Sequence, residues 1–170
     1  MVAAPEDRRM ANIRHTGSGF TDVREAPDDY VAVVDPKSLA EQYAALWNEP
    51  DPNVRRTIIR MLWAPDGEHI LDPPQELRRP AQALGFEAPT LEMRGYGTIE
   101  TRAARAYEEF VAPGEYVFRP RDNAARLRNI VKFNWEMVST TTGNVAGVGL
   151  EVLVLNDQGH ITIDYQFVEG

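Results

Sequence analysis

Gly147-Val-Gly-Leu-Glu-Val-Leu-Val-Leu155 is the most informative stretch of the sequence, because it is apolar at nearly every position. A strand that is apolar on both faces is buried on both faces, so this one lies inside a covered sheet. Its only charged residue is Glu151. A carboxylate in such a place must be paired, hydrogen-bonded or protonated, and burial by itself raises its pKa.

The buried acid has three interpretations at the level of the sequence. In the functional one, Glu151 is a carboxylic acid that is kept neutral to donate a hydrogen bond or to act as a general acid. In the structural ones, it pairs with an arginine such as Arg119 or Arg128, or it lies at a strand edge where the carboxylate reaches water. The sequence leaves all three open.

Further strand patterns lie on both sides of this stretch. Residues 116–119 form a short candidate strand, and residues 127–138 alternate between apolar and polar side chains. Thr142-Gly-Asn144 and Asn156-Asp-Gln-Gly159 provide turns, and residues 160–168 alternate again. Together these segments predict an antiparallel meander.

Two of these strands carry candidate binding residues. One face of 127–138 holds a large apolar set that forms either the core or the wall of a pocket, namely Val131, Phe133, Trp135 and Met137. In the last strand, simple alternation separates Asp164 and Gln166 from the apolar positions and sends both to solvent. The apolar positions there are Ile161, Ile163, Tyr165 and Phe167.

The region before the meander is helical. Asp35-Pro36 and Asp51-Pro52 each place an N-cap aspartate before a proline at the first helical position. Apolar stripes at helical spacing follow, Leu39, Tyr43 and Leu46 in the first helix and Val54, Ile58, Leu62 and Trp63 in the second. Thr98 is predicted to cap a third helix that reaches Phe110. Helices followed by a meander predict an α+β fold with the helices packed on one face of a curved sheet.

The chain divides into an arm and one domain. Residues 1–34 mix charge, Gly and Pro without a period, and they are predicted to form a flexible N-terminal arm. Residues 35–170 are predicted to form a single domain of ordinary size. Within it, a short strand at 68–72 leads into residues 73–97, which are long for a connection and predict a lid, a binding loop or a mobile segment.

The composition disfavours several classes of protein. With 18 Lys and Arg against 26 Asp and Glu, the net charge is -8, which repels nucleic acid and anionic membrane surfaces. The absence of cysteine excludes thiol catalysis and cysteine zinc sites. No apolar run is long enough to span a membrane and no secretory signal is recognisable, so a cytoplasmic location is expected.

Short catalytic and metal-binding motifs are also missing from the sequence. It contains no HExxH, P-loop or GxSxG pattern and no convincing GxGxxG pattern. The three histidines, His15, His69 and His160, do not have the spacing of metal ligands. We therefore expect neither a metal nor a cofactor.

The order and spacing of several motifs resemble the nuclear transport factor 2-like superfamily, which includes ketosteroid isomerases and SnoaL-like polyketide cyclases. The motifs are Gln42-Tyr-Ala-Ala-Leu-Trp-Asn48, Asp51, Met61-Leu-Trp-Ala-Pro-Asp-Gly67, Ile70-Leu-Asp-Pro73, Arg94-Gly95, Phe133-Asn-Trp135, Asp157-Gln-Gly159 and Ile161 to Phe167. The resemblance implies a cystatin-like cone, in which a curved antiparallel sheet wraps around three N-terminal helices and encloses a pocket. It also implies a homodimer through the outer face of the sheet.

The resemblance assigns roles to individual residues. In the isomerase branch, a tyrosine of the first helix and an acid of the penultimate strand donate hydrogen bonds to an oxyanion, and the aspartate of a strand-ending Asp-Pro is the base. By position, these residues are Tyr43, Glu151 and Asp72. The family pattern also places Asp164 and Gln166 on the concave face, against simple alternation. The substrate-binding candidates are Trp63, Phe133, Trp135, Met137 and Gln166.

Three departures from the isomerase branch shift the expected chemistry. Glu151 stands where that branch has aspartate, Asp164 adds a third carboxylate, and residues 73–97 are longer. We expect a cofactor-free acid–base isomerase, cyclase or epoxide hydrolase acting on a small hydrophobic or polycyclic, secondary-metabolite-like molecule, with Asp72, Tyr43, Glu151 and Asp164 as catalytic residues. The alternative is a non-catalytic ligand-binding or dimeric assembly module of the same fold, because one fold hosts many functions.

Overall fold

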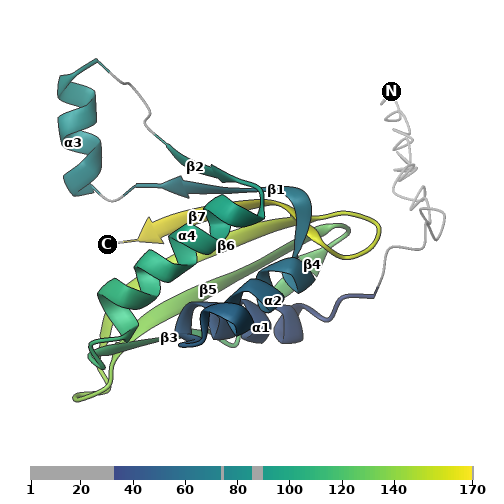
Figure 1. The fold of residues 1–170 in the computed structure, drawn as a ribbon, viewed down its shortest axis with the longest axis horizontal. Helices are drawn as coiled ribbons and strands as arrows, with labels where there is room; N and C mark the ends of the chain where they lie inside the picture. The colour runs from purple at the N-terminus through teal and green to yellow at the C-terminus, as the bar shows by residue number, and fades with distance from the viewer. Residues whose placement is uncertain (1–32, 74, 86–89, 170) are drawn as a thin grey trace, which may run out of the picture.

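The structure, a computed structural model, describes residues 33–73, 75–85 and 90–169 (Figure 1). Its helices are α1 (Pro36–Asn48), α2 (Pro52–Leu62), α3 (Gln75–Ala83) and α4 (Tyr96–Ala106), and α4 continues into a π-helical turn, η1 (Tyr107–Val111). Its strands are β1 (Trp63–Asp72), β2 (Leu91–Arg94), β3 (Tyr116–Pro120), β4 (Ala125–Leu127), β5 (Ile130–Ser139), β6 (Val145–Leu155) and β7 (Ile161–Glu169). Nearly all of the predicted arm, residues 1–34, lies outside the described residues.

The predicted α+β class is confirmed. The strands form one curved sheet in the order β2-β1-β7-β6-β5-β3, with β4 paired to β5. In Figure 1, α1, α2 and α4 lie against one side of this sheet, whereas α3 lies apart at the far end of β1 and β2. The sheet is not antiparallel throughout, because β1 and β7 pair in parallel. These two strands come from opposite ends of the domain, so no hairpin turn forces them to run in opposite directions.

The two proline-initiated helices begin where the sequence predicts. The Asp35 carboxylate accepts a hydrogen bond from the backbone N–H of Ser38 at 2.8 Å, and that of Asp51 accepts one from Asn53 at 2.8 Å. The predicted stripe of the second helix is wrong in detail. Val54 is exposed, whereas Ile59 is buried, and Trp63 is the first residue of β1 and not the last of the helix.

The segment 73–97 contains two regular elements, α3 and β2. Strand β2 forms an antiparallel pair with β1. The helix that the sequence predicts to be capped by Thr98 is α4, and it begins earlier, at Tyr96. Its N-cap is Gly95, whose φ of 77° lies in the left-handed region that glycine adopts without strain. Thr98 is therefore not the cap, and its hydroxyl donates to the carbonyl oxygen of Arg94 at 2.6 Å.

A bulge in β7 decides which of its side chains face the helices. Leu155 pairs with Ile161 and Val154 pairs with Ile163, so one extra residue is inserted between these pairs. An extra residue reverses the alternation beyond it. Ile161 and Asp164, three positions apart, are consequently both fully buried. This confirms the placement implied by the family resemblance and contradicts the simple alternation.

The first helix is fixed to the sheet by a reciprocal pair of hydrogen bonds. The side-chain amide of Asn48 donates to the carbonyl oxygen of Phe118 at 2.6 Å and accepts from its N–H at 2.8 Å. Because Asn48 is the last residue of α1 and Phe118 lies in β3, these bonds set the height of α1 over the sheet. They thereby position Tyr43, which lies on the buried face of the same helix.

Candidate functional site

A cavity of about 470 Å³ lies between α1, α4, η1 and the concave face of the sheet. Most of its lining is apolar, and the aromatic rings of Tyr43, Trp47, Phe110, Phe118 and Trp135 contribute to it. The other lining residues are Ala44, Leu71, Arg102, Ala106, Met137, Ala146, Gly147, Glu151, Gln166, Val168 and Glu169. An apolar space with a few polar groups is typical of a small-molecule site.

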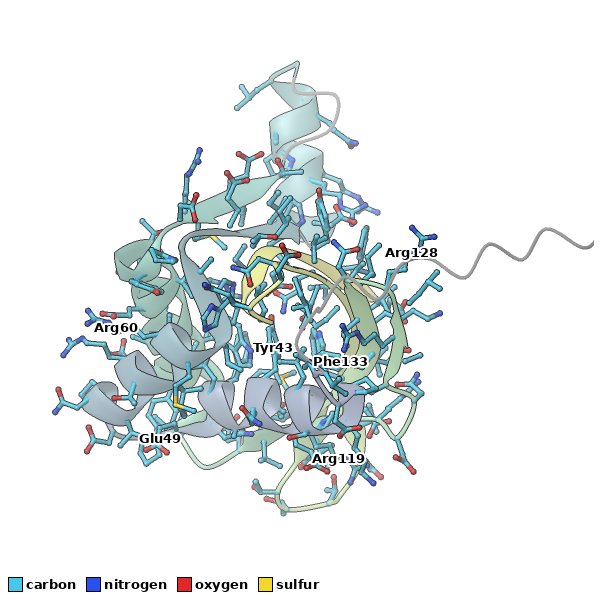
Figure 2. The ribbon with its side chains drawn as sticks, turned by 90° about the vertical axis from the view of Figure 1, so that its right-hand side faces the viewer. Tyr43, Glu49, Arg60, Arg119, Arg128 and Phe133 are labelled. Atoms are coloured by element: carbon cyan, nitrogen blue, oxygen red, sulfur yellow. The ribbon has the colours of Figure 1, made fainter. Side chains whose placement is uncertain are left out.

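Tyr43 lies at the inner end of this cavity and is almost completely buried. Figure 2 shows Tyr43 and Phe133 directed into the space between α1 and the curved sheet. Their rings meet edge to face with centroids 5.4 Å apart, and Trp63 packs on the other side of Tyr43 at 5.5 Å. The tyrosine hydroxyl donates to Oδ2 of Asp164 at 2.7 Å. The phenol is therefore held in one orientation.

Asp164 connects Tyr43 to a histidine. Its Oδ2 lies 2.7 Å from Nδ1 of His69, which reaches it from β1, and both residues are buried. A carboxylate oxygen can only accept, so Nδ1 of His69 carries the hydrogen of this bond. Within the described part of the chain, Oδ1 of Asp164 and Nε2 of His69 have no hydrogen-bond partner. Asp164 is thus a buried acceptor with one oxygen still unsatisfied.

Glu151 reaches the cavity from β6 and is 0% exposed. Its Oε1 accepts from the side-chain amide of Gln166 at 2.6 Å, and its Oε2 has no partner among the described residues. Arg119, one proposed cation, pairs with Glu136 instead, at 2.8 Å. Arg119 and Arg128 both lie at the periphery in Figure 2. The salt-bridge and strand-edge interpretations of Glu151 are therefore wrong.

The surroundings of Glu151 favour its neutral form. Burial first, and then the nearby Asp164 carboxylate, raise the pKa of Glu151 well above its ordinary value. Gln166 and the indole of Trp135 act in the opposite direction, more weakly. Trp135 lies close without a regular hydrogen bond, since its Nε1 has no partner among the described residues.

Tyr43 is held neutral by similar causes. Burial first, and then the charges of Asp164 and Glu151, raise the pKa of the Tyr43 phenol well above its ordinary value. The inner end of the cavity therefore presents a phenol and a carboxyl group whose surroundings favour their neutral forms, together with the amide of Gln166. All three can form hydrogen bonds to an oxygen-containing ligand.

The predicted base, Asp72, is not brought to this cavity. In β1, His69 and Leu71 face inward, so their neighbour Asp72 faces the opposite side of the sheet. Its Oδ2 lies 2.5 Å from the guanidinium of Arg78 in α3, and about a third of each side chain is exposed. Asp72 therefore has the position of a structural ion pair at the sheet surface and not of a base in the pocket.

The predicted substrate-binding residues divide into two groups. Trp135, Met137 and Gln166 line the cavity. Trp63 and Phe133 do not, because both are buried one layer deeper, where they pack around the ring of Tyr43. These two aromatic residues support the site without reaching a ligand.

Three residues of the site were missed at the level of the sequence. His69 was considered only as a metal ligand, although period-two alternation along β1 would have placed it on the same face as Leu71. Trp47 lies one turn after Tyr43 on the same buried face of α1. Arg102 shares a face of α4 and η1 with Ala106 and Phe110, at a spacing of four residues, and all three line the cavity.

Residues 33–73, 75–85 and 90–169 contain no group of three or more His, Cys, Asp or Glu side chains arranged to hold a metal ion. In these same ranges, no helix combines the length and the apolar character needed to cross a membrane.

Known structures resemble this fold. A SnoaL-like family protein from Agrobacterium tumefaciens, described as a candidate isomerase, is 23% identical, with 78% of this chain and 96% of that chain covered and a TM-score of 0.62. An NTF2-like protein of unknown function from Exiguobacterium is 12% identical, with coverages of 77% and 98% and a TM-score of 0.52. A SnoaL-like protein of unknown function from Burkholderia thailandensis is 14% identical, with coverages of 81% and 100% and a TM-score of 0.50. No protein-family model matches the sequence, and no curated protein matches it.

Proposed function

We propose that this chain, which has the fold of the nuclear transport factor 2-like superfamily, binds a small and mostly apolar organic molecule and catalyses proton transfer at one of its oxygen atoms. The observation that carries the proposal is Glu151, a fully buried acid at the inner end of an apolar cavity, whose Oε2 has no partner within the described residues. The reaction class is a cofactor-free isomerisation or cyclisation. Opening of an epoxide requires the same proton donation.

In the proposed step, Glu151 gives its proton to the carbonyl oxygen of the ligand while the ligand loses a carbon-bound proton to water in the cavity. The enol formed in this way can return to the ketone by the reverse transfers, so no proton is gained or lost overall. When Glu151 becomes a carboxylate, it faces Asp164. The bonds from Tyr43 and His69 to Asp164 reduce the repulsion between the two carboxylates.

The remaining polar groups position the ligand in this proposal. Because the amide of Gln166 donates a hydrogen bond to Oε1 of Glu151, Oε2 is the oxygen that carries the transferred proton. The rings of Trp47, Phe118 and Trp135 provide flat apolar walls that suit a ring system. The homodimer expected through the outer sheet face and the cytoplasmic location both stay predictions. Tyr165 and Phe167, which are partly exposed on that outer face, favour the homodimer.

The test uses β-tetralone, an apolar bicyclic ketone, in heavy water, with exchange of its α-protons followed by proton NMR. We expect the wild-type protein to accelerate this exchange above the buffer rate. Asp72→Asn should exchange the protons at the wild-type rate, because Asp72 pairs with Arg78 outside the cavity. Exchange at the buffer rate with wild-type protein would contradict the proposed function. A large loss in Asp72→Asn would restore Asp72 as the base.

A further inference from the structure

We propose that the cavity selects a carboxylate-bearing ring compound, and that Arg102 binds the carboxylate of this ligand while its reacting oxygen lies at Glu151. This inference deepens the proposed function and rests on it. Glu151 and Tyr43 do not determine whether the substrate is charged. Arg102 would select a substrate with a negative charge.

Among the residues that the structure describes, Arg102 forms no ion pair with an acidic side chain. It lines the cavity from α4, and no carboxylate lies within 4.0 Å of its guanidinium in the described parts of the chain. The guanidinium of Arg102 lies over the ring of Trp47, with its carbon 5.5 Å from the ring centroid. The other arginines that contact rings, Arg55 and Arg60, lie outside the cavity.

The partly buried position of Arg102 makes its positive charge unfavourable unless an anion pairs with it. The side chain is half-buried, and burial is the main cause that lowers its pKa. Arginine nevertheless keeps its charge in proteins. A partly desolvated cation without an anion is unfavourable, and a carboxylate that binds to it would recover this cost.

The acidic residues near Arg102 do not supply this anion. Glu151 acts on Arg102 only from a distance, and it is held neutral by burial and by Asp164. Glu109 also acts from a distance without forming an ion pair. Glu169 lines the cavity but is exposed to water, which screens its charge. The position opposite Arg102 is therefore open to an anionic group of the ligand.

The chemistry of the two ends then defines the ligand. A planar guanidinium recognises a carboxylate through two parallel hydrogen bonds. The aromatic rings between the ends suit a flat ring system, and the neutral acid at the inner end suits a carbonyl or hydroxyl oxygen. An apolar acid with one such oxygen fits both ends, whereas a neutral steroid-like molecule would leave Arg102 without a partner.

Binding of three matched probes tests the inference: β-naphthoate, β-naphthamide and β-naphthol, titrated into the full chain and followed by tryptophan fluorescence, since Trp47 and Trp135 line the cavity. We expect wild-type protein to prefer the acid over the amide by about tenfold or more, the usual gain from a charged hydrogen bond. Arg102→Gln should abolish this preference by weakening the binding of the acid more than that of the amide. Arg105→Gln, an exposed arginine of the same helix, is the control that should retain the preference.

The outcomes separate this inference from the proposed function. Equal binding of acid and amide by wild-type protein, or a preference for the acid that persists in Arg102→Gln, would overturn the carboxylate inference and leave the proposed function intact. A loss of all three probes in Arg102→Gln would assign the arginine a structural role and overturn the inference as well. Failure of wild-type protein to bind any probe would overturn both.

Discussion

Replacement of Glu151 by glutamine is expected to slow the enzyme-dependent exchange of β-tetralone by about 10² to 10⁴-fold, the usual contribution of a positioned proton donor. Glutamine has nearly the same shape and can keep a hydrogen bond to Gln166, but it cannot give up a proton. The measurement is the NMR exchange rate at a ketone concentration that saturates both proteins. Under these conditions, a loss of rate reports on the chemical step and not on binding.

Two controls make this result specific to the proton. Asp72→Asn removes a carboxylate of another strand from outside the cavity and should keep the wild-type rate. Binding of β-naphthol to Glu151→Gln should change little, because the cavity keeps its shape. If Glu151→Gln exchanged the ketone as fast as the wild type, the role of Glu151 as proton donor would be excluded.

Gly149→Val is expected to lower the free energy of unfolding by about 3 kcal/mol or more, or to prevent folding. A Cβ at this position would lie 2.4 Å from the indole of Trp135 and 2.7 Å from the backbone oxygen of Phe167. The indole could move only by leaving the cavity wall, and the carbonyl belongs to the neighbouring strand of the sheet. Urea unfolding of the full chain measures the loss.

Gly147→Ala is the matched control for this prediction. It lies on the same strand, but its Cβ would meet only Met137, at 3.5 and 3.8 Å, which are ordinary contacts. We expect its free energy of unfolding to stay within about 1 kcal/mol of the wild type. Equal stabilities of Gly149→Val and Gly147→Ala would show that Trp135 does not pack against β6 as described.

Local signals in the sequence were sufficient for the first two helices and for the burial of Glu151. The Asp-Pro caps act within three residues, and the apolar strand around Glu151 is buried whichever elements cover it. Asp164 was harder to place, because its direction depends on an extra residue in β7. That bulge is visible only when β7 is aligned with β6.

The errors at the site also have physical causes. The family resemblance assigns Asp72 as the base, although alternation along β1 turns His69 toward the cavity and Asp72 away from it. Arg102 lies on a helix that looks amphipathic and solvated in sequence. Only the packing of α4 on the sheet shows that one of its arginines faces an apolar space.

The protonation of Glu151 in the folded protein can be measured through stability. The measurement is the difference in unfolding free energy between wild type and Glu151→Gln over a series of pH values. Below the ordinary pKa of 4.5, Glu151 is protonated in both the folded and the unfolded wild-type chain. Above it, the folded chain keeps a proton that the unfolded chain releases, so rising pH favours unfolding until the raised pKa is passed.

We therefore expect the stability of wild type relative to Glu151→Gln to fall as the pH rises above 4.5, by at most about 1.4 kcal/mol per pH unit. The ionisable groups other than Glu151 are common to both proteins, so their contributions largely cancel in the difference. A difference that stays constant across this range, or that rises with pH, would mean that Glu151 is charged in the folded protein. That result would exclude Glu151 as a neutral proton donor.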